Sequence, residues 1–412
     1  MATVRPFNCI RPKEDVANRI AALPYDVYNS VEAKIETTRE PLSFLRIDRA
    51  ETQFEGEVYA YSPQVYQKAR QILDGMIEDG SFIMDEEACY YVYELTMNNR
   101  SQTGLVACAA IDDYLGNVIK KHENTREDKE IDRIKHVDTC SAQTGPIFLA
   151  YRSRKEIDEV VALVRREKAL YDFTSDDGIS HRVWRISDRE YVYRIEEAFR
   201  ELDSIYIADG HHRAASAVKV GLKRRNENPS YRGDEEFNYF LSVLFPHDQL
   251  MIMPYNRTVK DLNSLSVTRF LERVSESFEV ELFGDKPYSP DTKACFGMYL
   301  ESKWYILRAR NNILSNTDPV AALDVSILQD YLLKPILGIE DPRTDNRIDF
   351  IGGIRGLKEL ENRVSIDMTV AFSMYPTSIN ELFDVSDAGK LMPPKSTWFE
   401  PKLRSGLFIH RI

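Results

Sequence analysis

A short polar segment joins a predicted strand directly to a predicted helix, and this junction constrains the fold more than any other feature of the chain. Residues 204–208 are mostly apolar and indicate a buried strand, whereas residues 214–220 are rich in alanine and indicate a helix. Only residues 209–213, with the sequence Asp-Gly-His-His-Arg, lie between them. We therefore expect a sharp strand-to-helix corner that exposes the start of the helix.

The side chains of this corner are unusual for a helix start. Unpaired backbone N–H groups and partial positive charge favour acidic residues in the first turn of a helix. Here the turn holds His211, His212 and Arg213 instead, an arrangement that a bound anion would stabilise. The sequence predicts phosphate binding by these residues and Gly210, with Asp209 as the helix cap. The alternative is that Asp209 only caps and the histidines lie at the surface.

His122 and Glu123 are the best candidates for the remaining residues of such a site. They follow a predicted strand and precede a polar helix, expected from about Thr125 with a capping box. An imidazole and a carboxylate at a strand end can bind substrate or transfer a proton. The alternative is a surface pair between Glu123 and either Lys121 or Arg126.

Catalytic roles follow from the chemistry of these side chains. We expect Glu123 to be the general base, with His122 orienting it and with Asp209 and His211 as further catalytic residues. Glu32, on a helix expected after a cap at Asp26, is the rival carboxylate.

Two further cations are candidate accessory residues. Arg257 either clamps an anionic substrate or pairs with Asp261. Lys395 belongs to a proline-fixed cationic tail at residues 393–406, which can close over phosphates but lacks the spacing of a P-loop. The alternative is a docked tail with its charges in solvent.

The remaining pattern predicts an α+β protein, because strands and helices alternate without a long βαβ series. We expect a helix over residues 62–79, a hairpin over 88–111 and paired strands at 237–245 and 250–253. Further helices are expected at residues 155–167, 191–202, 267–278 and 320–333, and further strands at 146–151 and 303–308. The predicted domains are an N-terminal segment (residues 1–60), a core (61–260) and a C-terminal region (261–412).

Composition excludes several classes of function. The net charge of −12 argues against a nucleic-acid surface, and no apolar stretch approaches the roughly 18 residues of a membrane span. Charged residues near the start argue against a signal peptide, and five scattered cysteines without a C-x-x-C pair indicate reduced thiols. We expect a soluble cytoplasmic enzyme with a small-molecule substrate.

The chain resembles a family, the bacterial and archaeal proteins called domain-of-unknown-function family 1015, which is related to free-serine kinases of the ParB and sulfiredoxin superfamily. The corner at residues 209–213 looks like the signature of those kinases. The resemblance to the family extends over nearly the whole chain, through residues 23–27, 121–125, 145–148, 253–257 and 392–397.

The resemblance implies a ParB-like nucleotide core in residues 61–260 and a kinase that converts L-serine to O-phosphoserine. In the related kinases the helix after the motif holds nucleotide phosphates, a carboxylate activates the serine hydroxyl, and magnesium bridges the transferred group. ATP or ADP and Mg²⁺ are therefore the expected cofactors. The phosphate donor, the acceptor, the oligomeric state and the pathway stay open.

Two other functions remain as alternatives. A metal-dependent phosphohydrolase would bind zinc or manganese through His122, His211, His212 and a carboxylate, although no H-x-H or H-x-x-x-H pattern is present and no metal ligand is assigned. A nucleotide-switched binding module is disfavoured by the acidic charge and by the lack of a recognition helix.

Overall fold

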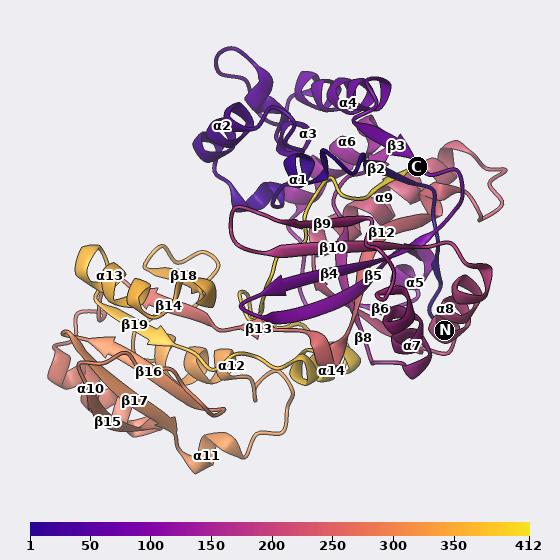
Figure 1. The fold of residues 1–412 in the computed structure, drawn as a ribbon. Coiled ribbons are helices and arrows are strands. Elements are labelled where there is room, and N and C mark those ends of the chain that lie inside the picture. Colours follow the sequence, from indigo (N-terminus) through magenta and orange to yellow (C-terminus); the bar gives the residue numbers. More distant parts are fainter. The chain divides into compact units, whose positions relative to one another are not determined.

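The computed structural model describes residues 1–412, which form two compact units (Figure 1). Unit 1 comprises Met1–Leu250 and Pro401–Ile412, and unit 2 comprises Met251–Glu400. These two units do not follow the boundaries of the three predicted domains, because unit 1 contains both ends of the chain. The three-domain division stays a prediction. Both units combine helices with sheets, so the molecule is α+β as expected.

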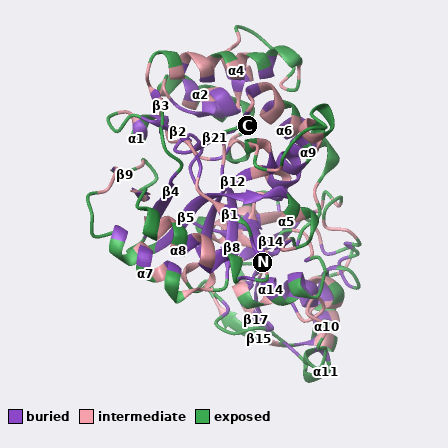
Figure 2. Cartoon of the chain, turned by 90° about the vertical axis from the view of Figure 1, so that its right-hand side faces the viewer, coloured by how far each residue is buried: buried purple, intermediate pink, exposed green.

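A nine-stranded sheet forms the centre of unit 1, in the order β6-β11-β8-β12-β5-β4-β10-β9 with β1 paired to β5. Its strands are β1 Val4–Arg5, β4 Tyr90–Met97, β5 Arg100–Ala110, β6 Ile119–Lys120, β8 Ile147–Tyr151, β9 Tyr171–Thr174, β10 Ser180–Ile186, β11 Ile205–Asp209 and β12 Tyr239–Pro246. Most neighbours are antiparallel, but β6 runs parallel to β11 and β8 runs parallel to β12. Strands β4, β5 and β12 are buried along most of their length (Figure 2).

The predicted hairpin is confirmed as β4 and β5, which are joined by a two-residue turn. Asn98 and Asn99 both have positive φ values, +50° and +62°, and asparagine tolerates this backbone in a two-residue turn. Arg100 pairs with Met97 directly across the turn. Because the turn is so short, the polar residues that follow it belong to β5 rather than to a loop.

Helices pack on this sheet through their apolar faces. They are α5 Ile111–Leu115, α6 Glu127–Cys140, α7 Lys155–Val164, α8 Arg189–Arg200 and α9 His211–Glu227, with 3-10 turns η3 Glu236–Asn238 and η4 His247–Gln249. Ile157 of α7, Phe199 of α8 and Val218 of α9 join one hydrophobic core with the strands, and α6 packs along α9. These contacts fix the direction in which α9 leaves the sheet.

A second, smaller layer of unit 1 joins the two ends of the chain. Its four-stranded sheet has the order β3-β2-β21-β7, with β2 Cys9–Pro12, β3 Phe82–Met84, β7 Ala142–Gln143 and β21 Ile409–Arg411. Its helices are α1 Ala17–Ile20, η1 Tyr25–Val27, α2 Ser30–Arg39, α3 Leu45–Asp48, η2 Ala50–Gln53 and α4 Pro63–Glu78, the last confirming the helix expected over residues 62–79. Because β21 pairs with β2, the chain returns to unit 1 after unit 2.

Two predicted helix caps are wrong. Helix α6 begins at Glu127 without a side-chain cap, and the Thr125 hydroxyl donates to Glu130 instead of capping. Helix α2 is capped by Asn29 rather than by Asp26, which lies in η1. In both cases a residue one to three positions away occupies the cap position, which sequence reasoning places only to within a few residues.

Unit 2 contains a six-stranded sheet in the order β15-β17-β16-β19-β14-β18 and a two-stranded sheet of β13 and β20. The strands are β13 Ile252–Met253, β14 Tyr255–Val259, β15 Phe278–Gly284, β16 Cys295–Leu300, β17 Lys303–Ala309, β18 Ile348–Gly352, β19 Val370–Ser373 and β20 Trp398–Phe399. The helices are α10 Val267–Ser277, α11 Asn311–Leu314, α12 Asp324–Leu328, η5 Gln329–Leu333, η6 Gly353–Arg355, α13 Lys358–Ile366 and α14 Ile379–Asp387. Trp304 and Leu360 lie in its core.

Two expectations for this part of the chain need correction. Residues 250–253 do not pair with the preceding strand in a central sheet, because both edges of β12 are already occupied by β5 and β8. The helix expected over residues 320–333 is shorter and continues as the π-helical turn η5. All five cysteines are buried and free, and no helix has the length and apolar composition needed to cross a membrane.

Gly210 connects β11 to α9 in a backbone conformation that favours glycine. Its φ is +94°, and a Cβ at this position would lie 3.0 Å from Nε and Nη2 of Arg213. Gly178, between β9 and β10, has a similar φ of +78°, but a Cβ there would meet no atom within 4 Å. A substitution at Gly178 therefore tests backbone strain alone. A substitution at Gly210 tests backbone strain together with crowding of the Arg213 side chain.

Replacing Gly210 with alanine should lower the free energy of unfolding by about 1–3 kcal/mol, because the left-handed backbone is strained for any residue with a Cβ. Gly178→Ala is the matched control and should cost only the backbone strain, about 1–2 kcal/mol. Urea denaturation of both variants measures the difference. A Gly210→Ala variant as stable as the parent would show that residue 210 does not hold this conformation.

Candidate active site

Helix α9 begins without a side-chain cap. Its N-cap residue is Gly210, and its first turn contains no acidic residue. The expectation that Asp209 caps the helix is wrong, because its carboxylate accepts the N–H of Gly210 at 2.9 Å and pairs with Nζ of Lys402 at 3.3 Å. The N–H groups of the first turn have no acceptor within the helix, so they are available to an anion.

Asp209 is strongly ionised at this corner. Burial by itself would raise the pKa of Asp209, but the positive charges of Lys402 and Arg213 hold it well below its usual range. Nη2 of Arg213 lies 4.0 Å from Oδ2 of Asp209. Two cations from distant parts of the chain therefore share one carboxylate beside the start of α9.

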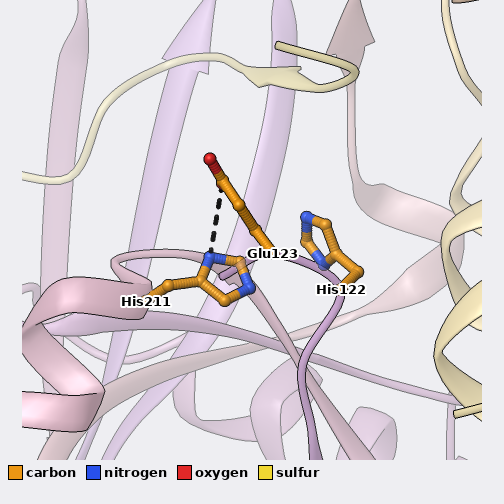
Figure 3. A group of neighbouring side chains, drawn as sticks. All are labelled: His122, Glu123 and His211. Atoms are coloured by element: carbon orange, nitrogen blue, oxygen red, sulfur yellow. Dashed lines mark ion pairs between the residues drawn. The ribbon is translucent and has the colours of Figure 1, made fainter. Parts of the chain in front are cut away.

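His122, Glu123 and His211 form a cluster at the same corner (Figure 3). Nδ1 of His211 lies 3.8 Å from Oε2 of Glu123. The imidazole rings of His122 and His211 meet edge to face, with their centroids 4.5 Å apart. The structure thus brings together two motifs that are more than eighty residues apart in the sequence.

Strand pairing explains this convergence. β6 runs parallel to β11, with Lys120 opposite Tyr206, and parallel strands end at the same edge of a sheet. His122 follows β6 by two residues, and His211 follows the end of β11 by two residues. Both histidines therefore leave the sheet at one edge.

Burial keeps both imidazoles neutral. His122 and His211 are 2% and 6% exposed, whereas the Glu123 side chain is 51% exposed. Burial lowers the pKa of His122 to about 4. Burial, together with the nearby His122, lowers the pKa of His211 well below its ordinary value. Nδ1 of His122 and Nε2 of His211 are buried without a hydrogen-bond partner in the protein.

His212 and Arg213 complete the first turn of α9. His212 is half-buried, its Nδ1 has no partner in the protein, and burial lowers its pKa. Nη1 of Arg213 donates to the carbonyl of Pro146 at 2.5 Å. This bond holds the guanidinium beside Gly145, where a Cβ would lie 3.6 Å from Nη1.

A small cavity of about 30 Å³ lies next to Arg213, and sequence reasoning missed most of the residues that line it. Tyr25 and Arg133 stack there, with the guanidinium carbon 4.0 Å from the ring centroid, and Asp48 accepts a hydrogen bond from Thr144. Tyr25 belongs to one of the family-like segments, which was a usable signal. The positions of Asp48 and Arg133 carry no such signal.

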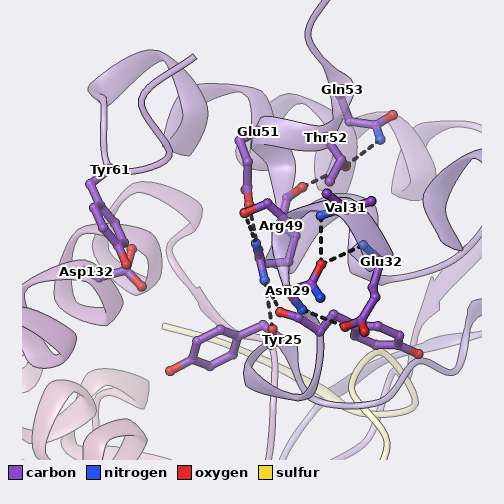
Figure 4. Close-up of polar contacts among 12 residues, drawn as sticks. Tyr25, Asn29, Val31, Glu32, Arg49, Glu51, Thr52, Gln53, Tyr61 and Asp132 are labelled. Carbon is purple, nitrogen blue, oxygen red and sulfur yellow. Dashed lines mark hydrogen bonds and ion pairs between the residues drawn. The ribbon is translucent and has the colours of Figure 1, made fainter. Parts of the chain in front are cut away.

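Glu32 has a structural contact that accounts for its position (Figure 4). It lies at the third position of α2, where its carboxylate accepts the backbone N–H of Asn29 while the Asn29 side chain accepts the N–H of Glu32. This reciprocal capping box stabilises the helix start. Its role as the rival catalytic base stays a prediction.

The two accessory cations belong to unit 2. Arg257 is buried and donates to the carbonyls of Tyr255 and Lys395, and Asp261 pairs with Arg347. The expected alternative of an Arg257–Asp261 pair is therefore wrong, because each partner is bonded elsewhere. Substrate contacts of Arg257 and Lys395 stay a prediction.

Lys402 is a site residue that sequence reasoning noticed only as part of a cationic tail. Residues 401–406 of the tail are docked, but the alternative with all charges in solvent is wrong for Arg404, which is buried and bonded to His181, Ser175 and Asp177. That docking brings Lys402 to the corner at Asp209. A lysine at this distance in sequence could not be assigned to the motif without the fold.

Comparison with solved structures finds remote likenesses. A free serine kinase in complex with AMP is 15% identical, with 74% of this chain and 91% of that chain covered and a TM-score of 0.33. A mutant free serine kinase in complex with ADP is 14% identical, covering 74% and 92%, with a TM-score of 0.34. SbnI from Staphylococcus aureus, truncated at its C-terminus, is 10% identical, covering 72% and 82%, with a TM-score of 0.37.

At these TM-scores the likenesses say nothing about what this chain binds. The comparison with curated proteins found no match. A family model, by contrast, matches residues 4–326, which include the corner, the His122-Glu123 pair, nearly all of unit 1 and about half of unit 2. The chain therefore belongs to the family described as protein of unknown function, DUF1015.

Proposed function

We propose that this protein is a nucleotide-dependent phosphotransferase that moves phosphate from ATP or ADP to the hydroxyl of a small molecule, L-serine first. The observation that carries the proposal is the uncapped, buried start of α9, where cations and unpartnered ring nitrogens surround the helix end. Such a helix end is a favourable site for phosphate groups. The likeness of residues 209–213 to the free-serine kinase signature is the reason for proposing L-serine as the phosphate acceptor.

The residues at the corner fit a nucleotide phosphate. Backbone N–H groups of the first turn can donate to phosphate oxygens, and His212 offers a ring nitrogen without a protein partner. Arg213 supplies a fork of donors beside the helix end. Lys402, now paired with Asp209, adds positive charge that offsets the carboxylate when a phosphate binds.

Glu123 is the proposed general base for the acceptor hydroxyl. Its side chain is half-exposed, so that a substrate can reach it, and it lies beside the start of α9. His211 is neutral at this position, and a neutral imidazole does not cancel the charge of the carboxylate. Phosphoryl transfer needs an oriented nucleophile whose proton is removed late, and a fixed carboxylate suits that task.

The donors of the cluster do not fit Mg²⁺ as a resident ion. Mg²⁺ prefers oxygen ligands in octahedral geometry, whereas His122 and His211 offer nitrogens and only Glu123 offers oxygen. Mg²⁺ carried by the nucleotide phosphates remains part of the proposal, as does the ParB-like nature of the core. No catalytic step is assigned to the ion.

A metal-dependent phosphohydrolase is the second candidate, because His122, Glu123 and His211 lie close enough to share an ion. His212, which the sequence placed in the same ligand set, is not part of that group. A hydrolase would release inorganic phosphate from the nucleotide without forming a phosphorylated amino acid. The products of the reaction therefore separate the two functions.

Incubation with L-serine, Mg²⁺ and either ATP or ADP should yield O-phosphoserine, detected by mass spectrometry. Threonine and homoserine serve as competing acceptors, and reactions without protein serve as the control. Nucleotide hydrolysis with no phosphorylated amino acid from any acceptor would exclude the kinase and favour the hydrolase.

Arg213→Ala should weaken nucleotide binding by about 1.5–3 kcal/mol, the typical value of a lost charge-assisted hydrogen bond. Isothermal titration with ATP, ADP and AMP measures this change. Arg225→Ala, on the same helix but bonded to Asp112, is the matched control and should bind nucleotide like the parent. Equal affinities for the two variants would remove Arg213 from the site.

Glu123→Gln should lower turnover by about 10²–10⁴-fold, because it removes the basicity of the side chain and keeps its shape. Nucleotide affinity should stay near that of the parent. Glu32→Gln is the control and should be nearly silent, since glutamine also serves in a capping box. If turnover instead falls only in Glu32→Gln, the base is Glu32.

A further inference from the structure

We propose that His122, Glu123 and His211 form a binding site for one divalent ion of borderline hardness, Zn²⁺ first, beside the start of α9. The site goes beyond the proposed function, because it requires neither a nucleotide nor phosphoryl transfer.

The spacing of the three side chains suits a shared ion. Ligand atoms from the three residues all lie within 4.8 Å of one another. Bonds of about 2.0–2.2 Å to nitrogen or oxygen place neighbouring ligands roughly 3–4 Å apart. The 3.8 Å between Nδ1 of His211 and Oε2 of Glu123 lies in that range, and small rotations of a half-exposed glutamate would close the rest.

The burial of His122 points to an ion independently of the spacing. The residue is 2% exposed, and its Nδ1 is buried without a hydrogen-bond partner in the protein. A buried polar atom without a partner is costly unless a ligand satisfies it. Coordination of an ion would satisfy this nitrogen.

The packing of the two rings also suits an ion. The imidazoles of His122 and His211 meet edge to face, with their centroids 4.5 Å apart. A cation beside Nδ1 of His122 would bind a buried ring nitrogen that has no hydrogen-bond partner in the protein.

The chemistry of the ligand set selects the class of ion. Two nitrogens and one carboxylate oxygen are typical of zinc, cobalt or ferrous iron rather than of magnesium, calcium or manganese. Three protein ligands leave coordination positions open, as in catalytic rather than structural sites. If Glu123 binds the ion through one carboxylate oxygen, its second oxygen can still accept the proton of the acceptor hydroxyl.

The test is metal binding by the full chain in the absence of nucleotide. Protein stripped with a chelator is titrated with Co²⁺, followed by visible absorption, and with Zn²⁺, followed by calorimetry. We expect one ion per chain, with visible bands of a nitrogen- and oxygen-ligated site and no displacement by an equal concentration of Mg²⁺. Glu123→Gln and His122→Asn should each weaken binding at least about tenfold.

His247→Asn is the matched control, because it removes a histidine that accepts the Ser153 N–H elsewhere in unit 1, and its affinity should equal that of the parent. Circular dichroism verifies that each variant is folded. Because Glu123→Gln replaces an exposed side chain, this variant alone tests the metal site if His122→Asn unfolds. No saturable binding by the parent, or equal weakening in the control, would overturn the site.

The metal site and the phosphotransferase can fail separately. Formation of O-phosphoserine by a chain that binds no Co²⁺ or Zn²⁺ would remove the metal site and leave the kinase. Specific metal binding without nucleotide binding would leave the metal site and remove the kinase.

Discussion

The uncapped start of α9 is the physical feature on which the candidate site depends. Gly210 turns the chain from β11 into the helix with a positive φ, and neither a capping side chain nor a first-turn acid satisfies the helix start. Asp209, the residue best suited to cap, is bonded to the Gly210 N–H and to Lys402. The unpaired N–H groups and the helix dipole therefore favour an anion from outside the chain.

Pairing between distant strands supplies the other groups around this end. The parallel pair β6–β11 brings His122 and Glu123 to the edge where α9 begins. The antiparallel pair β8–β11 brings Pro146, whose carbonyl holds Arg213. The strand β21 anchors the last residues of the chain in unit 1 and keeps Lys402 close by. Each contribution is a backbone pairing, which makes the geometry insensitive to most surface substitutions.

The same corner contains two kinds of electrostatic environment. Asp209 lies among cations and stays ionised, whereas the buried rings of His122 and His211 are neutral. The first environment suits phosphate and its counter-ions, and the second suits a metal or a proton acceptor. Glu123, half-exposed between them, can serve either chemistry, which is why the kinase and hydrolase functions have to be separated by their products.

The sequence by itself determined the elements whose signals are local. The amphipathic pattern of α4, the hairpin of β4 and β5 and the corner at residues 209–213 depend on neighbouring residues, and all three are present. The sequence also nominated both halves of the site, because histidines in a helix start and at a strand end are locally unusual. Only the tertiary structure decided that these halves adjoin and that Asp209 binds Lys402 rather than capping. It likewise decided that Glu32 completes the cap of α2, and that Asp48 and Arg133 line a cavity beside Arg213. These outcomes depend on strand order and on the return of the chain end, and no local pattern of side chains encodes contacts between residues that far apart in sequence.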